Sequence, residues 1–263
     1  MPELPEVETV RRVLLERLKG ARVSGVWVPR VTFYRKPPPS SVDGLEGRVL
    51  EGARRRGKYF ILEFSGGREL TGHLGMSGRL FLAAASDPLQ RHERFRMDFG
   101  EASMRFVDPR RFGRIGCPLP EFGPEPLSAE FDGAWLHRVT RTRGAAIKHV
   151  LMDGHVVAGV GNIYANEALF RAGISPRTSA RRLSRERCHV LAAKIRETLE
   201  LAINAGGSSL RDYLRSDGMA GNFQSQFMAY DRAGEPCQRC GALIREIRQG
   251  QRSTFYCPGC QRR

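Results

Sequence analysis

The sequence predicts an α+β protein of more than one domain, with a β-rich first half, a helical second half and a small metal-binding hairpin at the end. Three observations support this prediction. The 263 residues exceed what one small core needs, so two domains are expected. Short strand patterns fill the first half, whereas helical periodicity dominates after Ser128. Two Cys-x-x-Cys pairs lie near the C-terminus.

A helix is predicted near the N-terminus, from about Pro5 to Lys19. Pro5 suits the first turn of a helix, where its missing N–H costs nothing. Gly20 then provides a C-terminal stop. Four apolar residues between them recur at helical spacing: Val7, Val10, Leu14 and Leu18. Such a helix would hold the residues before it rigidly against a core.

The residues before this helix carry a possible nucleophile. Proline is small enough for Met1 to be removed, which would leave a secondary amine at Pro2 beside the carboxylate of Glu3. An α-amino group has a reference pKa of about 7.7–8.0, so a useful fraction is unprotonated near neutral pH. Such an amine can attack an electrophilic carbon and form an iminium. From these residues alone, the simpler interpretation is that Pro2 and Pro5 only mark the beginning of a helix.

Short strands are predicted through the rest of the first half. The segments with strand signals are 23–28, 45–51, 58–64, 94–99 and 103–107. Arg94–Phe99 alternates apolar and charged residues, and it can pair with 103–107 across Gly100-Glu101. Many short strands with turn signals at this spacing predict a β-sandwich or a barrel.

A Pro- and Gly-rich stretch, Cys117–Pro126, predicts an interdomain linker, and helices follow it. The helical segments are expected at 128–139, at 144–152 and from Ser184 to Ile203. We therefore divide the chain into a helix and strand-rich domain at 1–117, a hinge at 118–130, a helical domain at 131–228 and a cysteine-containing module at 229–263.

Another helix start lies at Gly159-Val160-Gly161-Asn162. The glycines do not follow a convincing nucleotide-binding strand, so we reject a dinucleotide site. The free N–H groups at a helix start still favour an anion, and a nucleic-acid phosphate is one candidate.

The charge of the chain favours a polyanionic partner. Lys and Arg number 43 against 28 Asp and Glu, a formal net charge of +15. Neutralising phosphates with counterion release drives the binding of such proteins to nucleic acid. Solvated basic faces and docking on an anionic membrane are alternatives. The membrane alternative is weak, because no apolar run approaches a membrane span and the acidic N-terminus lacks a secretory signal. A cytosolic location is expected.

The two cysteine pairs are Cys237/Cys240 and Cys257/Cys260, with sixteen residues between them. In a reducing cytosol this spacing predicts a zinc site in preference to disulfides or a redox dithiol. Four thiolates close a tetrahedral shell, so one structural zinc ion is expected. The segment between the pairs predicts a hairpin that turns at 249–251, and so small a module would need the metal to fold.

Four long runs resemble the bacterial formamidopyrimidine-DNA glycosylases: Met1–Thr9, Asp108–Gly113, Gly159–Phe170 and the finger. Those enzymes excise oxidised purines from duplex DNA and then cut the abasic strand. The resemblance covers essentially the whole chain. It implies a helix and β-sandwich, a hinge, and a helix-two-turn-helix domain carrying a zinc finger, with DNA between the domains. We expect a monomer that binds duplex DNA containing oxidised purines or abasic sites.

The resemblance implies four catalytic residues. Pro2 would attack C1′ of the damaged nucleotide, and Glu3 would handle proton transfer at the sugar. Lys58 ends a match to the family's Arg-Arg-Gly-Lys motif and would act as a proton donor near the sugar. Arg252 matches the finger arginine that binds the phosphates flanking the lesion and assists δ-elimination.

The resemblance also implies seven DNA contacts. Enzymes that flip a base must fill the hole it leaves, and wedge residues do this. Met76, Arg110 and Phe112 match the family's void-filling triad, with Arg110 facing the orphaned cytosine. The matches to backbone or basic contact positions are His92, Arg143, Lys148 and Asn162. The glycine-rich segment 216–224 corresponds to the loop that caps the extruded base.

Two alternatives stay open. An endonuclease VIII-like relative shares the fold but prefers oxidised pyrimidines, and Leu4, Arg110 and Phe112 argue against it. A non-catalytic zinc-finger regulator fits the charge and the finger equally well. It has no need of a free Pro2 followed by Glu3.

Overall fold

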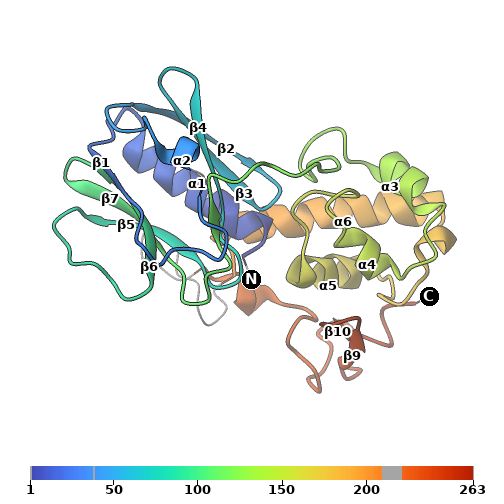
Figure 1. Cartoon of the computed structure of the whole chain (residues 1–263). Helices are drawn as coiled ribbons and strands as arrows, with labels where there is room; N and C mark the ends of the chain where they lie inside the picture. The colour runs from blue at the N-terminus through green and yellow to red at the C-terminus, as the bar shows by residue number, and fades with distance from the viewer. Residues whose placement is uncertain (1, 38, 209–220, 263) are drawn as a thin grey trace. The chain divides into compact units, whose positions relative to one another are not determined.

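The computed structural model describes the chain except for residues 1, 38, 209–220 and 263 (Figure 1). It contains two compact units, one of residues 1–120 with 203–222 and one of residues 121–202 with 223–263. The sequence-based division places 203–222 in the helical domain, whereas here they join the first unit. Most of the segment expected to cap an extruded base lies outside the described residues. Among the described helices, none has the length and apolarity that crossing a membrane requires.

The first unit begins with α1 (Leu4–Leu18), as the apolar periodicity predicts. Its apolar stripe is completely buried: Leu4, Val7, Val10 and Leu14 are 0% exposed and Leu18 is 2% exposed. The first turns of α1 are buried on their polar sides as well, at Glu6, Glu8 and Thr9. The start of this helix is therefore enclosed by protein.

Two four-stranded antiparallel sheets pack beside α1 and form a sandwich. One sheet has the order β1 (Gly25–Trp27), β6 (Glu93–Phe99), β7 (Ala102–Val107), β5 (Arg79–Ala84). The other has the order β2 (Leu50–Arg56), β3 (Tyr59–Phe64), β4 (Arg68–His73), β8 (Arg114–Ile115). The short helix α2 (Pro39–Val42) precedes β2. The predicted sandwich is confirmed.

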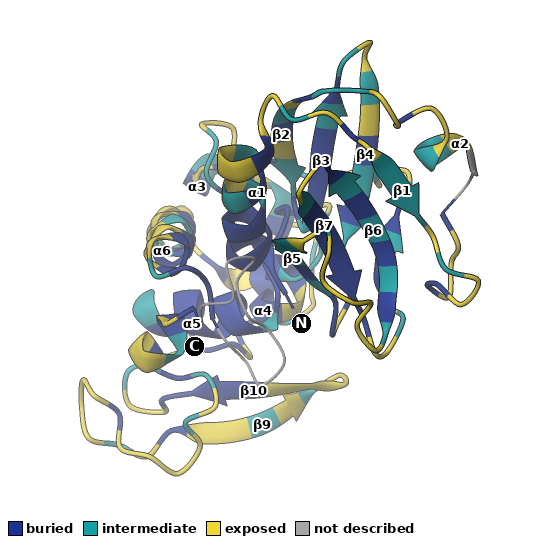
Figure 2. Cartoon of the chain, turned by 90° about the vertical axis from the view of Figure 1, so that its left-hand side faces the viewer, coloured by how far each residue is buried: buried dark blue, intermediate teal, exposed yellow. Residues whose placement is uncertain are grey.

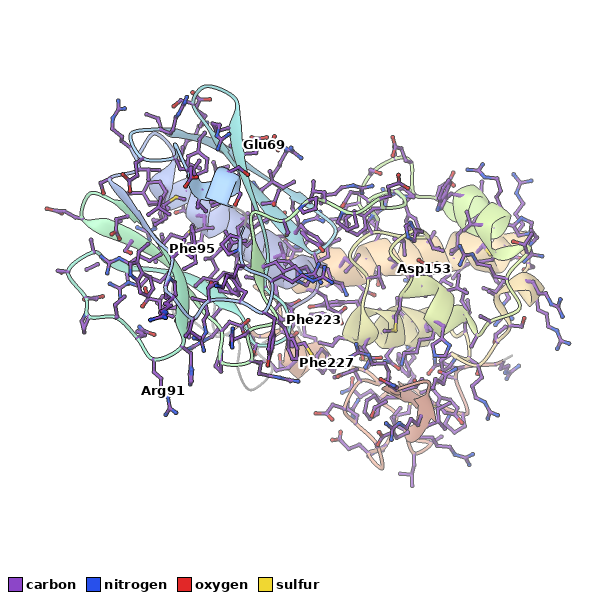
Figure 3. The ribbon with its side chains drawn as sticks, viewed as in Figure 1. Glu69, Arg91, Phe95, Asp153, Phe223 and Phe227 are labelled. Atoms are coloured by element: carbon purple, nitrogen blue, oxygen red, sulfur yellow. The ribbon has the colours of Figure 1, made fainter. Side chains whose placement is uncertain are left out.

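The core of the sandwich follows the alternation of its strands. In β6, Phe95, Met97 and Phe99 face inward, as the pattern at 94–99 predicts. Phe95 lies among the side chains between the sheets (Figure 3). The expected strand at 45–51 is wrong for most of its length, because Leu45 packs in the core from a loop and β2 begins at Leu50.

The second unit contains α3 (Gly133–Thr140), α4 (Ile147–Leu151), α5 (Asn162–Arg171) and most of α6 (Arg185–Asn204). The predicted helix start at Ser128 is wrong. Asp132 caps α3 instead, since its Oδ1 accepts the Trp135 N–H at 2.6 Å. The expected helix at 144–152 is confirmed in its central part as α4.

A two-stranded antiparallel hairpin closes the chain, formed by β9 (Arg245–Gln249) and β10 (Arg252–Tyr256). Strand β9 is largely exposed, whereas the C-terminal half of β10 is buried (Figure 2). The predicted hairpin and its turn are confirmed.

Two buried polar side chains of helix α5 anchor this hairpin and the segment that precedes it. The Glu167 carboxylate accepts the backbone N–H groups of residues 228–230 at 2.8 to 3.1 Å and pairs with Arg171. Asn166 Oδ1 accepts the Phe255 N–H of β10 at 2.8 Å. Buried acceptors with partners of this kind fix one geometry, because leaving any of them unpaired is costly.

Aromatic rings extend the same connection. Successive ring centroids lie 5.2 to 5.7 Å apart along the series Tyr164, Phe223, Phe227, Tyr230 and Phe255. Phe223 and Phe227 are neighbours in Figure 3. Contacts at this spacing add to burial, so the finger packs on α5 as part of the core of the unit.

Candidate functional site

The N-terminal residues Pro2 and Glu3 are buried at the start of α1. Glu3 is 2% exposed and occupies the cap position of the helix. The Glu3 N–H donates to Glu6 Oε2 at 2.8 Å. Glu6 Oε1 in turn accepts the N–H and the hydroxyl of Ser208 at 2.8 and 3.0 Å. One buried carboxylate therefore holds the start of α1 and a segment some 200 residues further along the chain.

Sequence reasoning missed Glu6 as a site residue. The available signal was its position three residues after the cap, the spacing at which a carboxylate returns to the cap N–H. Its contact with Ser208 had no signal, because the two residues are separated by 202 positions.

Lys58 lies in the turn between β2 and β3, next to a pair of rings from Tyr59, which is buried, and His73, which is half-buried. Tyr59 and His73 pair across β3 and β4, and their ring centroids lie 4.7 Å apart. Burial, and then the charges of Lys58 and Arg114, lower the pKa of His73 to about 4. His73 is therefore neutral at physiological pH, and its Nδ1 accepts the Gly75 N–H at 3.0 Å. A lone histidine in a strand gave no sequence signal, so His73 was not predicted.

The low pKa of His73 makes stability depend on pH. We expect the free energy of unfolding to fall by about 1.5 kcal/mol between pH 6.5 and pH 5 through His73. The unfolded histidine takes up a proton with a pKa of about 6.5, whereas the folded one resists until about pH 4. Stability is thus lost as the pH falls. Urea denaturation of the wild type and of His73→Asn at both pH values measures this, and an equal drop in both proteins would contradict it.

The three predicted void-filling residues lie on two neighbouring turns of the first unit. Met76 is 37% exposed and Phe112 is 44% exposed. Arg110 is also exposed, and its Cζ lies 5.1 Å from the centre of the Phe112 ring. The two turns touch through their backbones, because a Cβ on Gly75 would lie 2.6 Å from Gly113 N. The structure therefore brings Met76, Arg110 and Phe112 to one surface.

A further aromatic residue joins this surface. Tyr34 is 67% exposed, and its ring centre lies 5.7 Å from that of Phe112. The Cζ atom of Arg111 lies 4.8 Å from the centre of the Tyr34 ring, so Arg111 packs beside these two aromatic residues. Tyr34 was missed, because it stands in a loop without a motif.

His92 is half-buried in the loop before β6, in the same unit. Its backbone has φ of 68°, which is unusual for a residue other than glycine. Its Nδ1 lies 3.2 Å from Arg94 Nη2. This loop leads into β6 beside other basic side chains, and a backbone contact by His92 stays a prediction.

In the second unit, two predicted contact residues meet at β10. Asn162 begins α5, and its Nδ2 donates to Ser253 O at 3.2 Å. Lys148 Nζ donates to the same oxygen at 3.0 Å and to Thr254 Oγ1 at 2.5 Å. Lys148 is 0% exposed, so its ammonium lies inside the unit, where it joins α4 to the finger. The sequence did not predict this packing role.

The remaining predicted contacts of this unit, Arg252 and Arg143, are exposed and half-buried, respectively. Arg252 begins β10 and lies opposite Gln249 at the end of the hairpin. Arg143 pairs with Asp153 at 2.8 Å, and its side chain is 39% exposed. Asp153 is marked in Figure 3. An ion pair at this exposure contributes little stability and can be exchanged for another anion.

The four predicted metal ligands converge. The Sγ atoms of Cys237, Cys240, Cys257 and Cys260 all lie within 4.8 Å of one another. The contacts Cys237–Cys260 and Cys240–Cys257 measure 3.8 and 3.4 Å. Zn–S bonds of about 2.3 Å in a tetrahedron place sulfurs about 3.8 Å apart, so these thiols fit one zinc ion. Cys117 and Cys188 lie elsewhere as free thiols.

Three family models match successive parts of the chain. They are the formamidopyrimidine-DNA glycosylase N-terminal domain at residues 1–115, the formamidopyrimidine-DNA glycosylase H2TH domain at 122–213, and a zinc finger found in FPG and IleRS at 234–263.

Full-length relatives and solved structures agree with these matches. The formamidopyrimidine-DNA glycosylases of Thiobacillus denitrificans and Methylococcus capsulatus are 49% and 47% identical, each over 100% of both chains. Lactococcus lactis Fpg bound to DNA with an abasic site has a TM-score of 0.91 at 34% identity. MutM bound to DNA with carbocyclic 8-oxo-G has a TM-score of 0.90 at 35% identity. Both structures and the chain cover each other completely.

Proposed function

The chain belongs to the formamidopyrimidine-DNA glycosylase family, and from this premise we propose how its own residues carry out the reaction. The enzyme removes oxidised purines from DNA and then cleaves the abasic strand, so it is both a glycosylase and a lyase. An endonuclease VIII-like preference for oxidised pyrimidines and a non-catalytic regulator both disagree with this membership. We place the enzyme in the bacterial cytoplasm, on chromosomal DNA.

Pro2 is the nucleophile of the first step. After removal of Met1, its nitrogen is a secondary amine that attacks C1′ of the flipped nucleotide. The bond from C1′ to the base breaks, and the base leaves with the bonding electron pair and a proton. The C1′–O4′ bond then opens to a Schiff base, with Glu3 supplying the proton to O4′. The buried position of Glu3 at the helix cap, one residue after Pro2, supports this role, because burial restricts the motion of its carboxyl.

Strand scission follows from the charge of this Schiff base. A secondary amine gives an iminium that keeps its positive charge, so the C2′ proton becomes acidic. Loss of that proton expels the 3′ phosphate, and a second elimination expels the 5′ phosphate. Lys58 acts as a proton donor near the sugar. Arg252 binds the flanking phosphates and neutralises the charge of the leaving group.

DNA is held by contacts from both units. Met76, Arg110 and Phe112 fill the gap that the flipped base leaves, and their exposure on touching turns supports this role. Asn162 and His92 contact the phosphate backbone, with Arg143 and Lys148 adding positive charge to the second unit. One structural zinc ion bound by the four cysteines holds the hairpin that presents Arg252.

Borohydride reduction during turnover tests the covalent step. With a duplex containing 8-oxoguanine opposite cytosine, we expect a stable adduct between protein and DNA, because borohydride reduces the iminium to an amine. Peptide mapping should place the adduct on Pro2. Undamaged duplex is the control and should give no adduct. Strand cleavage without any adduct, or an adduct on a lysine, would contradict the proposal.

The full-length similarity to glycosylases, together with the buried Pro2–Glu3 start, is the observation that carries this proposal.

A further inference from the structure

A buried hydrogen-bond network connects the two turns that carry Met76, Arg110 and Phe112. The Ser77 hydroxyl donates to Asp108 Oδ1 at 2.6 Å. The second carboxylate oxygen, Oδ2, accepts the Gly113 N–H at 2.7 Å. Ser77 Oγ also accepts the Arg110 N–H at 3.3 Å. Each bond starts or ends one residue from a member of the void-filling triad.

The burial of this network makes its geometry strict. Asp108 is 0% exposed and Ser77 is 8% exposed. A carboxylate only accepts hydrogen bonds, and here each of its two oxygens has a donor from a different turn. Removing one donor would leave a buried acceptor unpaired, which costs more than the bond itself is worth.

Backbone packing also fixes the distance between the two turns. Gly75 has φ of +68°, and a Cβ there would lie 2.6 Å from both Gly113 N and Phe112 C. No side chain separates the turns at this point. A shift of one turn would therefore break the two hydrogen bonds of Ser77, to Asp108 and from Arg110, and displace Met76 relative to Phe112.

We propose that Ser77 and Asp108 are positioning residues that preorganise the void-filling triad before DNA is bound. This inference rests on the void-filling role proposed above. Exposed apolar side chains on two independent turns would sample many arrangements, and ordering them would weaken insertion into the helix. The network removes that cost, because supporting hydrogen bonds fix the turns that present the three side chains.

A double-mutant cycle with Phe112 tests this inference. In the wild-type background, we expect Ser77→Ala to slow single-turnover excision of 8-oxoguanine opposite cytosine on the order of tenfold. In the Phe112→Ala background, the same change should slow excision by less than about twofold, because the side chain that Ser77 positions is already absent. Asp108→Asn should show the same pattern and serves as a second variant.

A single-stranded DNA substrate distinguishes a positioning role of Ser77 from a general structural role. A single-stranded oligonucleotide with a preformed abasic site has no gap between base pairs, so Ser77→Ala should cleave it at the wild-type rate. Ser103→Ala is the matched control, since Ser103 is a buried serine of β7 whose hydroxyl has no hydrogen-bond partner among the described residues. It should leave both activities unchanged.

The following results would overturn the inference. Equal losses in the two backgrounds, an equal loss on the single-stranded substrate, or no loss at all would show that Ser77 does not act through the triad. So would a Phe112→Ala variant with wild-type excision. A wild type that neither excises nor forms the borohydride adduct would instead overturn the proposed function.

Discussion

A form of the protein that retains one residue before Pro2 is expected to lose base excision and strand scission by a factor on the order of 10³ or more. With a residue attached, the Pro2 nitrogen is an amide, whose lone pair cannot attack C1′. The terminus is also enclosed, because Pro2 and Glu3 are buried at the start of α1. Movement of the added residue would not restore the amine, because the amide bond to Pro2 persists.

Single-turnover cleavage of an 8-oxoguanine duplex measures this loss, and intact mass verifies the N-terminus of each sample. Pro5→Ala is the matched control, since it changes a neighbouring proline in the first turn and leaves the terminal amine intact. It should retain activity, with at most a small loss of stability. Undiminished scission by the extended protein would show that the nucleophile is another group.

The second large effect concerns the zinc site. We expect Cys257→Ser to abolish zinc binding and to weaken binding to a duplex with an uncleavable abasic-site analogue by about 100-fold or more. Cys257 is completely buried in the finger core, and metal binding supplies the folding free energy of so small a module. Loss of the metal should displace Arg252 and also Ser253, which accepts hydrogen bonds from Lys148 and Asn162.

The comparison with Arg252→Ala makes this prediction specific. Arg252→Ala should keep one zinc ion and weaken DNA binding less than Cys257→Ser does, because only one contact is removed. Cys117→Ala changes a free cysteine outside the cluster and should keep both zinc and affinity. If Cys257→Ser held one zinc ion and bound DNA like the wild type, the four-cysteine site would be wrong.

Much of the fold could be predicted from local patterns. The apolar spacing of α1 and the alternation of β6 each indicate one buried face, and the structure has those faces. Strands β4 and β5 were not predicted. β4 contains Arg68, Glu69 and Gly72, so it lacks a β-rich pattern and owes its conformation to pairing with β3. The start of α3 was misplaced, because Ser128 and Asp132 are both suitable caps and only packing selects between them.

The site could be predicted only where one segment carried the signal. The spacing of four cysteines identifies the metal ligands without any other knowledge. Pro2, Glu3 and the void-filling triad depended on the resemblance. The burial of Lys148 could not be predicted, because its acceptor Ser253 lies 105 positions away. The contact of Glu6 with Ser208 could not be predicted for the same reason, because residues so far apart in sequence meet only when the chain folds.

The Glu167 carboxylate has a consequence for protein engineering. Together with Asn166, it holds residues 228–230 and Phe255 through backbone N–H groups. The terminal hairpin is thus not an independent module, because its packing depends on α5. A chimera that receives a finger from another protein would also need a compatible α5, or the buried Glu167 carboxylate would lose its backbone donors and keep only Arg171. Evolution of the two segments is constrained in the same way, so substitutions in α5 and in the finger are expected to be coupled.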